Sequence, residues 1–304
     1  MLQISAAISA GEAERPVRPH ELQDPLNRWL YHPLAWQLAK GLARTPLTPN
    51  TVSVIGACFV LAAAWSYALP GWPGPALLGL ALHMTWHVVD GADGDLARLT
   101  GRASPLGEMV DGVCDYASHV VLYLVLGWIV TRPGGFFAAH WLVGWGLLVV
   151  AGIGHAVQSN HVEVQRRQYQ YWVYGTPWIR HSHAAEGSAT GESKLGLLVT
   201  AYLNAASGMT PHALHVDAAV ARAQGDPAAL ARIAAAVRAE APPLLLVYKF
   251  LGPNPRAIVL GLSMLAGSPL WYLLYQAALL NLLLLVSVRL HNAAARRIDA
   301  AIGA

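Results

Sequence analysis

Long apolar runs, separated by short polar or proline-rich segments, dominate the hydrophobic pattern of the chain. Several of these runs approach the ~20 residues that an α-helix needs to cross a bilayer. The predicted spans cover about 51–69, about 76 to the polar loop 99–106, that loop to about 131, about 137–158, about 256–268 and about 270–290. The pattern therefore predicts an all-α polytopic membrane protein with six transmembrane helices.

The segments outside the spans have patterns of their own. Residues 22–45 intersperse tryptophan and leucine with basic side chains, which is typical of an amphipathic helix in the membrane interface. An amphipathic helix packed on protein fits the same pattern. The Ala- and Arg-rich stretch 216–240 is expected to form one or two helices, broken at Gly225–Pro227. The predicted organisation is a mobile tail 1–21, an interfacial helix 22–45, transmembrane helices 1–4 in 46–158, a helical cytoplasmic insertion 159–254, and transmembrane helices 5–6 with a C-terminal tail in 255–304.

The composition agrees with a membrane location. Hydrophobic residues make up 55% of the chain, whereas charged residues make up only 12%. Because soluble domains carry about 25% charged residues, much of the surface is expected to face the lipid bilayer. The net charge of +3 is small, and we expect no nucleic-acid partner.

The basic residues predict how the chain is oriented in the membrane. With six spans, the N-terminal segment, the loop 99–106, the region 159–255 and the C-terminus all lie on one side. Of the 20 Lys and Arg residues, only Arg132 falls in a loop on the opposite side. Since basic loops face the cytoplasm, we expect the end of the bundle at the loop 99–106 to lie on the cytoplasmic side of the inner cell membrane.

Four aspartates flank that loop. Asp90 and Asp93 share one helical face at the end of the second span, and Asp111 and Asp115 share another at the start of the third. About fourteen apolar residues precede the first pair, roughly 20 Å of helix at ~1.5 Å per residue. The third span continues for roughly 24 Å beyond the second pair by the same rise. An antiparallel arrangement therefore places all four acids at one depth.

Such a cluster has a specific chemical use. Ionisable side chains within a span are costly and are usually functional, and four neighbouring carboxylates repel one another unless cations neutralise them. Mg²⁺ and Mn²⁺ prefer carboxylate oxygen and bridge it to phosphate. Two such ions can clamp both oxygens of a displacement at phosphorus. Arg98 adds a phosphate donor, while Gly94 and Ala97 leave room for a base or ribose. The pattern predicts a site for a nucleotide diphosphate with two divalent ions.

These residues also fit a known signature. The pattern Asp90-x-x-Asp93-Gly94-x-x-Ala97-Arg98, eight residues, Gly107-x-x-x-Asp111-x-x-x-Asp115 resembles that of the CDP-alcohol phosphotransferases (CDP-alcohol phosphatidyltransferases). The resemblance implies six spans and a homodimer. It also implies transfer of a phospho-group, expected to be phosphatidyl, from a CDP-activated donor such as CDP-diacylglycerol to the hydroxyl of a polar alcohol. CMP is released, and the product is a phospholipid.

The resemblance also implies roles for individual residues. Asp90, Asp93 and Asp111 would hold metal, and Asp115 would help to hold the second ion and act as general base on the acceptor hydroxyl. The residues expected to contact the CDP moiety are Asn50, Thr51, Gly94, Ala97, Arg98, Ser104 and Gly107. Asp95 lies outside the signature and is expected to be solvated or salt-bridged. His83, His87 and His119 are expected to be packed and neutral.

The acceptor site is less defined by the sequence. The candidates are polar residues of the later spans and the insertion: His155, Asn160, His161, Arg166, Arg167, Lys249, Arg289, His291 and Asn292. The same residues fit a second interpretation, in which they are cytoplasmic basic and polar residues at helix ends. The acceptor itself stays open among inositol, inositol phosphate, glycerol phosphate, serine, choline and ethanolamine.

Two other functions would use the same acids. A divalent-cation transporter would line its path with them, and an intramembrane metal-dependent hydrolase would use the ions with water as acceptor. A transporter does not require Arg98, the small residues or their fixed spacing. The sequence therefore favours the transferase.

Overall fold

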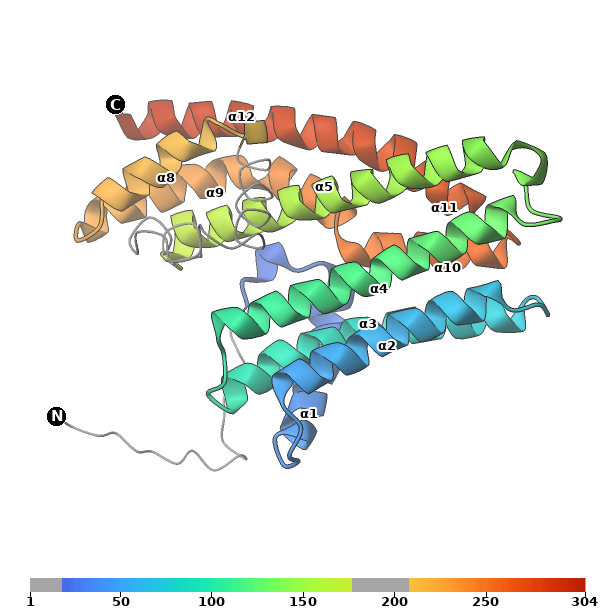
Figure 1. The fold of residues 1–304 in the computed structure, drawn as a ribbon. Coiled ribbons are helices and arrows are strands. Elements are labelled where there is room, and N and C mark those ends of the chain that lie inside the picture. The colour runs from blue at the N-terminus through green and yellow to red at the C-terminus, as the bar shows by residue number, and fades with distance from the viewer. Residues whose placement is uncertain (1–17, 177–207, 304) are drawn as a thin grey trace, which may run out of the picture. The chain divides into compact units, whose positions relative to one another are not determined.

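The computed structural model describes residues 18–176 and 208–303, which form helices and turns without a strand (Figure 1). The chain divides into two compact units. The first comprises Met1–Gly152 and Arg256–Leu274, and the second comprises Ile153–Pro255 and Tyr275–Ala304. The predicted all-α class is confirmed for the described residues.

The first unit contains most of the helices that surround the acids. Its elements are the short helix η1 (His20–Leu22), the π-helical turn η2 (Asn27–Tyr31), α1 (His32–Leu42), α2 (Pro49–Ala68), α3 (Gly74–Leu99), α4 (Pro105–Thr131), the short helix η3 (Ala138–His140), the start of α5 (Trp141–Tyr174), most of α10 (Pro253–Leu265) and α11 (Leu270–Leu274). α2 packs closely against both α3 and α4, and the short connection between α3 and α4 reverses the chain (Figure 1).

The second unit contains the remainder of α5 together with α8 (Ala213–Arg222), α9 (Pro227–Phe250), the π-helical turn η4 (Tyr275–Leu279) and α12 (Leu280–Gly303). The predicted break at Gly225–Pro227 is confirmed, because α8 ends before it and α9 begins at Pro227. α5 continues without interruption past residue 158 to Tyr174. The predicted boundary between the fourth span and the insertion, at residue 158, is therefore not a break in the helix.

Local sequence determines where several helices begin. Thr48 and Ser104 precede α2 and α4, and each side-chain oxygen accepts a hydrogen bond from the backbone N–H three residues later, at 3.2 and 3.1 Å. A proline follows each cap, where its missing N–H costs no helical hydrogen bond. Asp226 caps α9 in the same way before Pro227. These caps place the starts of α2 and α4, which lie beside the acids.

Small residues let the first helices approach closely. Ala35 and Ala39 of α1 pack with Ala92 of α3 in a buried cluster. A Cβ added to Gly91 would lie only 3.1 Å from the Cβ of Ala35. The opposite side of this N-terminal helical segment stays exposed, with Trp29 73% accessible. One face of this segment is therefore packed on protein, as the alternative interpretation expects. The other face is free to contact lipid.

Apolar helices identify the chain as a multi-pass membrane protein. Among the described residues, four helical segments are long and apolar enough to cross a bilayer: Pro49–Ala68, Leu106–Thr131, Ala138–Tyr174 and Leu270–Gly303. Large apolar side chains on these helices are exposed, such as Trp65 at 70% and Leu142 at 68%, which is unusual for a surface in water. α3 and α10 occupy the places of the other two predicted spans, so the number six stays a prediction. Residues 1–17 of the predicted tail lie outside the described residues.

The packing of α2 on α3 can be tested at Gly79. A Cβ added there would lie 2.4–2.9 Å from ring atoms of the buried Tyr67. We expect Gly79→Ala to destabilise the protein by about 1–3 kcal/mol, as overpacking does, although alanine favours helix by ~1 kcal/mol. The measurement is thermal unfolding of the purified protein in detergent.

Gly146→Ala in α5 is the matched control, because no heavy atom lies within 4 Å of the added Cβ. This variant should unfold at the wild-type temperature or above. Equal unfolding temperatures for the two variants would contradict the close contact between α2 and α3.

Candidate functional site

Three carboxylates from two helices meet in the first unit. One oxygen each of Asp90 on α3 and of Asp111 and Asp115 on α4 all lie within 4.8 Å of one another, and all three residues are partly buried. Oxygens bound to one Mg²⁺ or Ca²⁺ ion lie about 2.0–2.6 Å from it, hence up to about 4–5 Å apart. The three carboxylates could therefore hold a divalent ion.

Asp93 lies beside this group and is fixed by a third helix. Its side chain is only 6% exposed. The hydroxyl of Ser53 on α2 donates to its Oδ2 at 2.5 Å, and its carboxylate also interacts with Asp111. The contact of Ser53 with Asp93 is not predicted from the sequence. The sequence feature that could have indicated this role is a small hydroxyl side chain within an apolar span, three positions after Asn50.

Asp115 has a partner, Trp86, that is likewise not predicted from the sequence. The indole Nε1 of Trp86 donates to Asp115 Oδ1 at 3.3 Å. The Trp86 ring lies 4.5 Å from the His87 ring and 4.7 Å from the His119 ring, measured between centroids. His119 Nδ1 lies 2.8 Å from the backbone carbonyl of Asp115, so this nitrogen must carry the hydrogen. The histidines are packed as expected, and the rings of all three lie against the indole that contacts Asp115.

The starts of α2 and α4 form a second part of the site. A Cβ added to Gly107 would lie 3.3 Å from Ser104 Oγ and 3.6 Å from Asn50 Oδ1. The structure thus brings these three predicted residues together. Asn50, Ser104 and Thr51 are exposed. Because backbone N–H groups at helix N-termini favour anions, this region is suited to phosphate.

Arg98 lies along the last turns of α3. Its guanidinium lies over Gly94, where an added Cβ would be 3.5 Å from Nη2. Arg98 Nη2 donates to Asp95 Oδ1 at 2.5 Å, and Arg18 Nη2 donates to the same oxygen at 2.5 Å. Asp95 is 1% exposed, so it is salt-bridged as predicted, but the solvated alternative is wrong. Ala97, one residue before Arg98, is partly buried.

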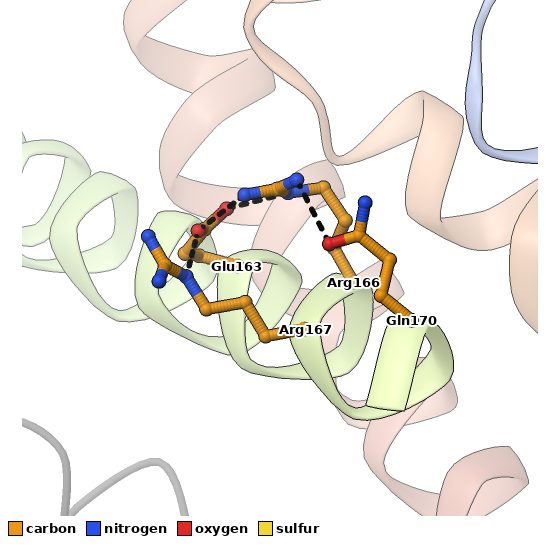
Figure 2. Close-up of polar contacts among 4 residues, drawn as sticks. All are labelled: Glu163, Arg166, Arg167 and Gln170. Atoms are coloured by element: carbon orange, nitrogen blue, oxygen red, sulfur yellow. Dashed lines mark hydrogen bonds and ion pairs between the residues drawn. The ribbon is translucent and has the colours of Figure 1, made fainter. Parts of the chain in front are cut away.

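All nine acceptor candidates belong to the second unit. Figure 2 shows that Glu163 pairs with both candidate arginines of α5: Arg166 at 2.6 Å and Arg167 at 2.5 Å. Arg166 Nη1 also donates to Gln170 Oε1 at 3.3 Å (Figure 2). The Glu163 spacing of three and four residues could have predicted these pairs. The single Glu163 carboxylate thus compensates one of the two positive charges within the helix.

Two of the other candidates make hydrogen bonds within the second unit. His161 Nε2 lies 3.0 Å from Ser287 Oγ. Asn292 Nδ2 donates to the carbonyls of Met209 and Val288 at 2.8 and 3.0 Å. These contacts join α5 and the segment before α8 to α12, which is a structural role. These hydrogen bonds do not indicate which alcohol the protein binds.

Comparison with known proteins gives two matches. Residues 46–181 match the family described as CDP-alcohol phosphatidyltransferase. An archaetidylinositol phosphate synthase from Aeropyrum pernix is 38% identical over 99 residues, which cover 30% of this chain and 47% of the relative. The chain thus spans about half the length of this curated relative.

The cluster of Asp90, Asp111 and Asp115 allows a prediction about metal binding. Asp111→Asn removes one negative charge from this cluster of carboxylates. It should weaken Mn²⁺ binding by about tenfold or more, as loss of a ligand or of its immediate support does. The measurement is a titration of the purified protein with Mn²⁺, with free ion followed by electron paramagnetic resonance.

Asp299→Asn is the control, since Asp299 pairs with His215 in the second unit. It should leave Mn²⁺ affinity at the wild-type value. If the two variants bound Mn²⁺ equally well, the cluster of Asp90, Asp111 and Asp115 would not be the ion site.

Proposed function

Because residues 46–181 belong to the CDP-alcohol phosphatidyltransferase family, we propose that the protein is a phosphotransferase of phospholipid synthesis. It transfers a phosphatidyl-type group from a CDP-activated donor, such as CDP-diacylglycerol, to the hydroxyl of a polar alcohol and releases CMP. The observation that carries this proposal is the convergence of Asp90, Asp111 and Asp115 from two helices. Their spacing in the sequence is that of the family signature.

The acids are assigned to a pair of Mg²⁺ or Mn²⁺ ions. Asp90, Asp93 and Asp111 would hold metal, and Asp115 would help to hold the second ion. The donor set fits, because all four ligands are carboxylates, which these hard ions prefer. When bound, the ions would neutralise the diphosphate and stabilise the charge that develops on its oxygens.

The nucleotide is assigned to the adjoining small residues and helix starts. Asn50, Thr51, Ser104 and Gly107 lie at the N-termini of α2 and α4, which favour phosphate. Gly94 and Ala97 present little bulk on α3, and Arg98 extends along the same helix with a half-exposed guanidinium. These residues bind and orient the CDP moiety of the donor.

Asp115 is assigned as the general base. Trp86 N–H donates to its Oδ1, which orients the carboxylate. Asp115 takes the proton of the acceptor hydroxyl, the resulting alkoxide attacks the phosphorus next to the lipid, and the bond to CMP breaks. CMP leaves with the electron pair, so atoms and charge balance.

The proposed membrane placement follows from the charged residues. We place six spans in the inner cell membrane, with the N-terminal helix in the interface and the acids near the cytoplasmic side. Arg132, at the opposite end of α4, is satisfied by the carbonyl of Ala68 at 3.2 Å and lies over the Trp128 ring at 4.7 Å. These contacts hold the guanidinium against the helix end but leave its positive charge in place, so Arg132 stays the exception to the charge asymmetry. A homodimer remains part of the proposal through the family resemblance.

The name of the relative suggests a first acceptor to test. A synthase of archaetidylinositol phosphate has an inositol phosphate group in its product. We therefore place inositol phosphate first, ahead of inositol, glycerol phosphate, serine, choline and ethanolamine.

The test is an assay of CMP release from CDP-diacylglycerol with Mg²⁺ or Mn²⁺ and each acceptor in turn, with products separated by mass. We expect metal-dependent CMP release together with one lipid adduct. Asp115→Asn should lower turnover by about 10²–10⁴-fold, the usual contribution of a general base, while CDP binding persists. Asp299→Asn should retain turnover.

Two outcomes would contradict the proposal. Release of phosphatidate without an alcohol adduct would assign a hydrolase instead. Undiminished turnover in Asp115→Asn would reject Asp115 as the base.

A further inference from the structure

Asp95 is a buried carboxylate that the proposed mechanism does not use. It is 1% exposed, and a single oxygen, Oδ1, accepts from both Arg18 and Arg98 at 2.5 Å. Arg98 is three residues away on α3, whereas Arg18 is 77 positions earlier, in the segment before η1. The N-terminal segment is thus tied to the end of α3 that carries the family's arginine.

The charges of these three side chains do not cancel, because two guanidiniums pair with one carboxylate. An unpaired buried carboxylate is costly, so one arginine must stay on Asp95, but the second is in excess. An isolated Asp95–Arg98 pair would be neutral and would offer little attraction to a diphosphate. With Arg18 present, the three groups sum to one positive charge.

The exposure and position of the two arginines decide which one serves a ligand. The Arg98 side chain is 50% exposed and lies over Gly94, whereas the Arg18 side chain is 26% exposed. Arg98 therefore faces the surface that we assign to the nucleotide.

We propose that Asp95 and Arg18 are positioning residues for Arg98. Asp95 holds the Arg98 guanidinium against Gly94, and Arg18 neutralises Asp95 so that the charge of Arg98 stays available to the diphosphate of the CDP donor. This inference rests on the proposed function and extends it to a residue of the N-terminal segment.

The test measures CDP affinity of the purified full chain with Mg²⁺ by calorimetry, and KM and kcat for CDP-diacylglycerol. Arg18→Gln should weaken CDP binding by about tenfold, equivalent to ~1.4 kcal/mol. KM should rise by the same factor at nearly constant kcat, because ground-state and transition-state binding are lost equally. Arg18→Lys retains the cation and should recover most of the affinity.

A double-mutant cycle separates the proposed coupling from a direct effect. In an Asp95→Asn background there is no buried charge for Arg18 to neutralise, so Arg18→Gln should then change CDP affinity by less than about twofold. Arg28→Gln is the control for lost positive charge, since Arg28 lies over the Trp29 ring at 4.7 Å. It should bind CDP as the wild type does.

The outcomes distinguish the inference from the proposed function. An equal loss from Arg18→Gln in both backgrounds, no loss at all, or no recovery in Arg18→Lys would overturn the positioning role alone. Failure of the wild-type protein to bind CDP would overturn the proposed function and this inference together.

Discussion

The mutual repulsion of carboxylates between α3 and α4 is the constraint on which the structure depends. Oxygens of Asp90, Asp111 and Asp115 lie within 4.8 Å of one another, and like charges at such distances repel strongly where the dielectric is low. Divalent ions, as proposed for this site, would convert this repulsion into attraction. α2 packs against both α3 and α4 and thereby spaces the two helices that carry the acids.

The surrounding residues hold two of the carboxylates in place through protein contacts alone. Ser53 fixes Asp93 from α2, and Trp86 fixes Asp115 from α3. The caps at Thr48 and Ser104 place the starts of α2 and α4 beside the same group. Such preorganisation lowers the cost of binding a highly charged diphosphate. It also explains why hydroxyl, indole and glycine residues interrupt otherwise apolar helices.

The sequence could predict the helical class, the break before Pro227 and the meeting of acids from two helices, because each depends on local spacing. It could not predict the bonds of Ser53 to Asp93 or of Arg18 to Asp95, since these join residues 40 and 77 positions apart. It placed a boundary at residue 158 because hydropathy falls there, yet polar residues continue a helix as readily as apolar ones. Arg166 and Arg167 fit an acceptor site by charge alone, but Glu163, three and four residues earlier, pairs with both of them.

The central claim is that carboxylates of α3 and α4 share divalent ions, and anomalous diffraction from crystals grown with Mn²⁺ and CDP tests it most directly. The account predicts two manganese peaks, each about 2.0–2.3 Å from carboxylate oxygens, with at least one bridging Asp90 and the α4 acids. Manganese peaks elsewhere, or bound CDP without manganese at these aspartates, would contradict it.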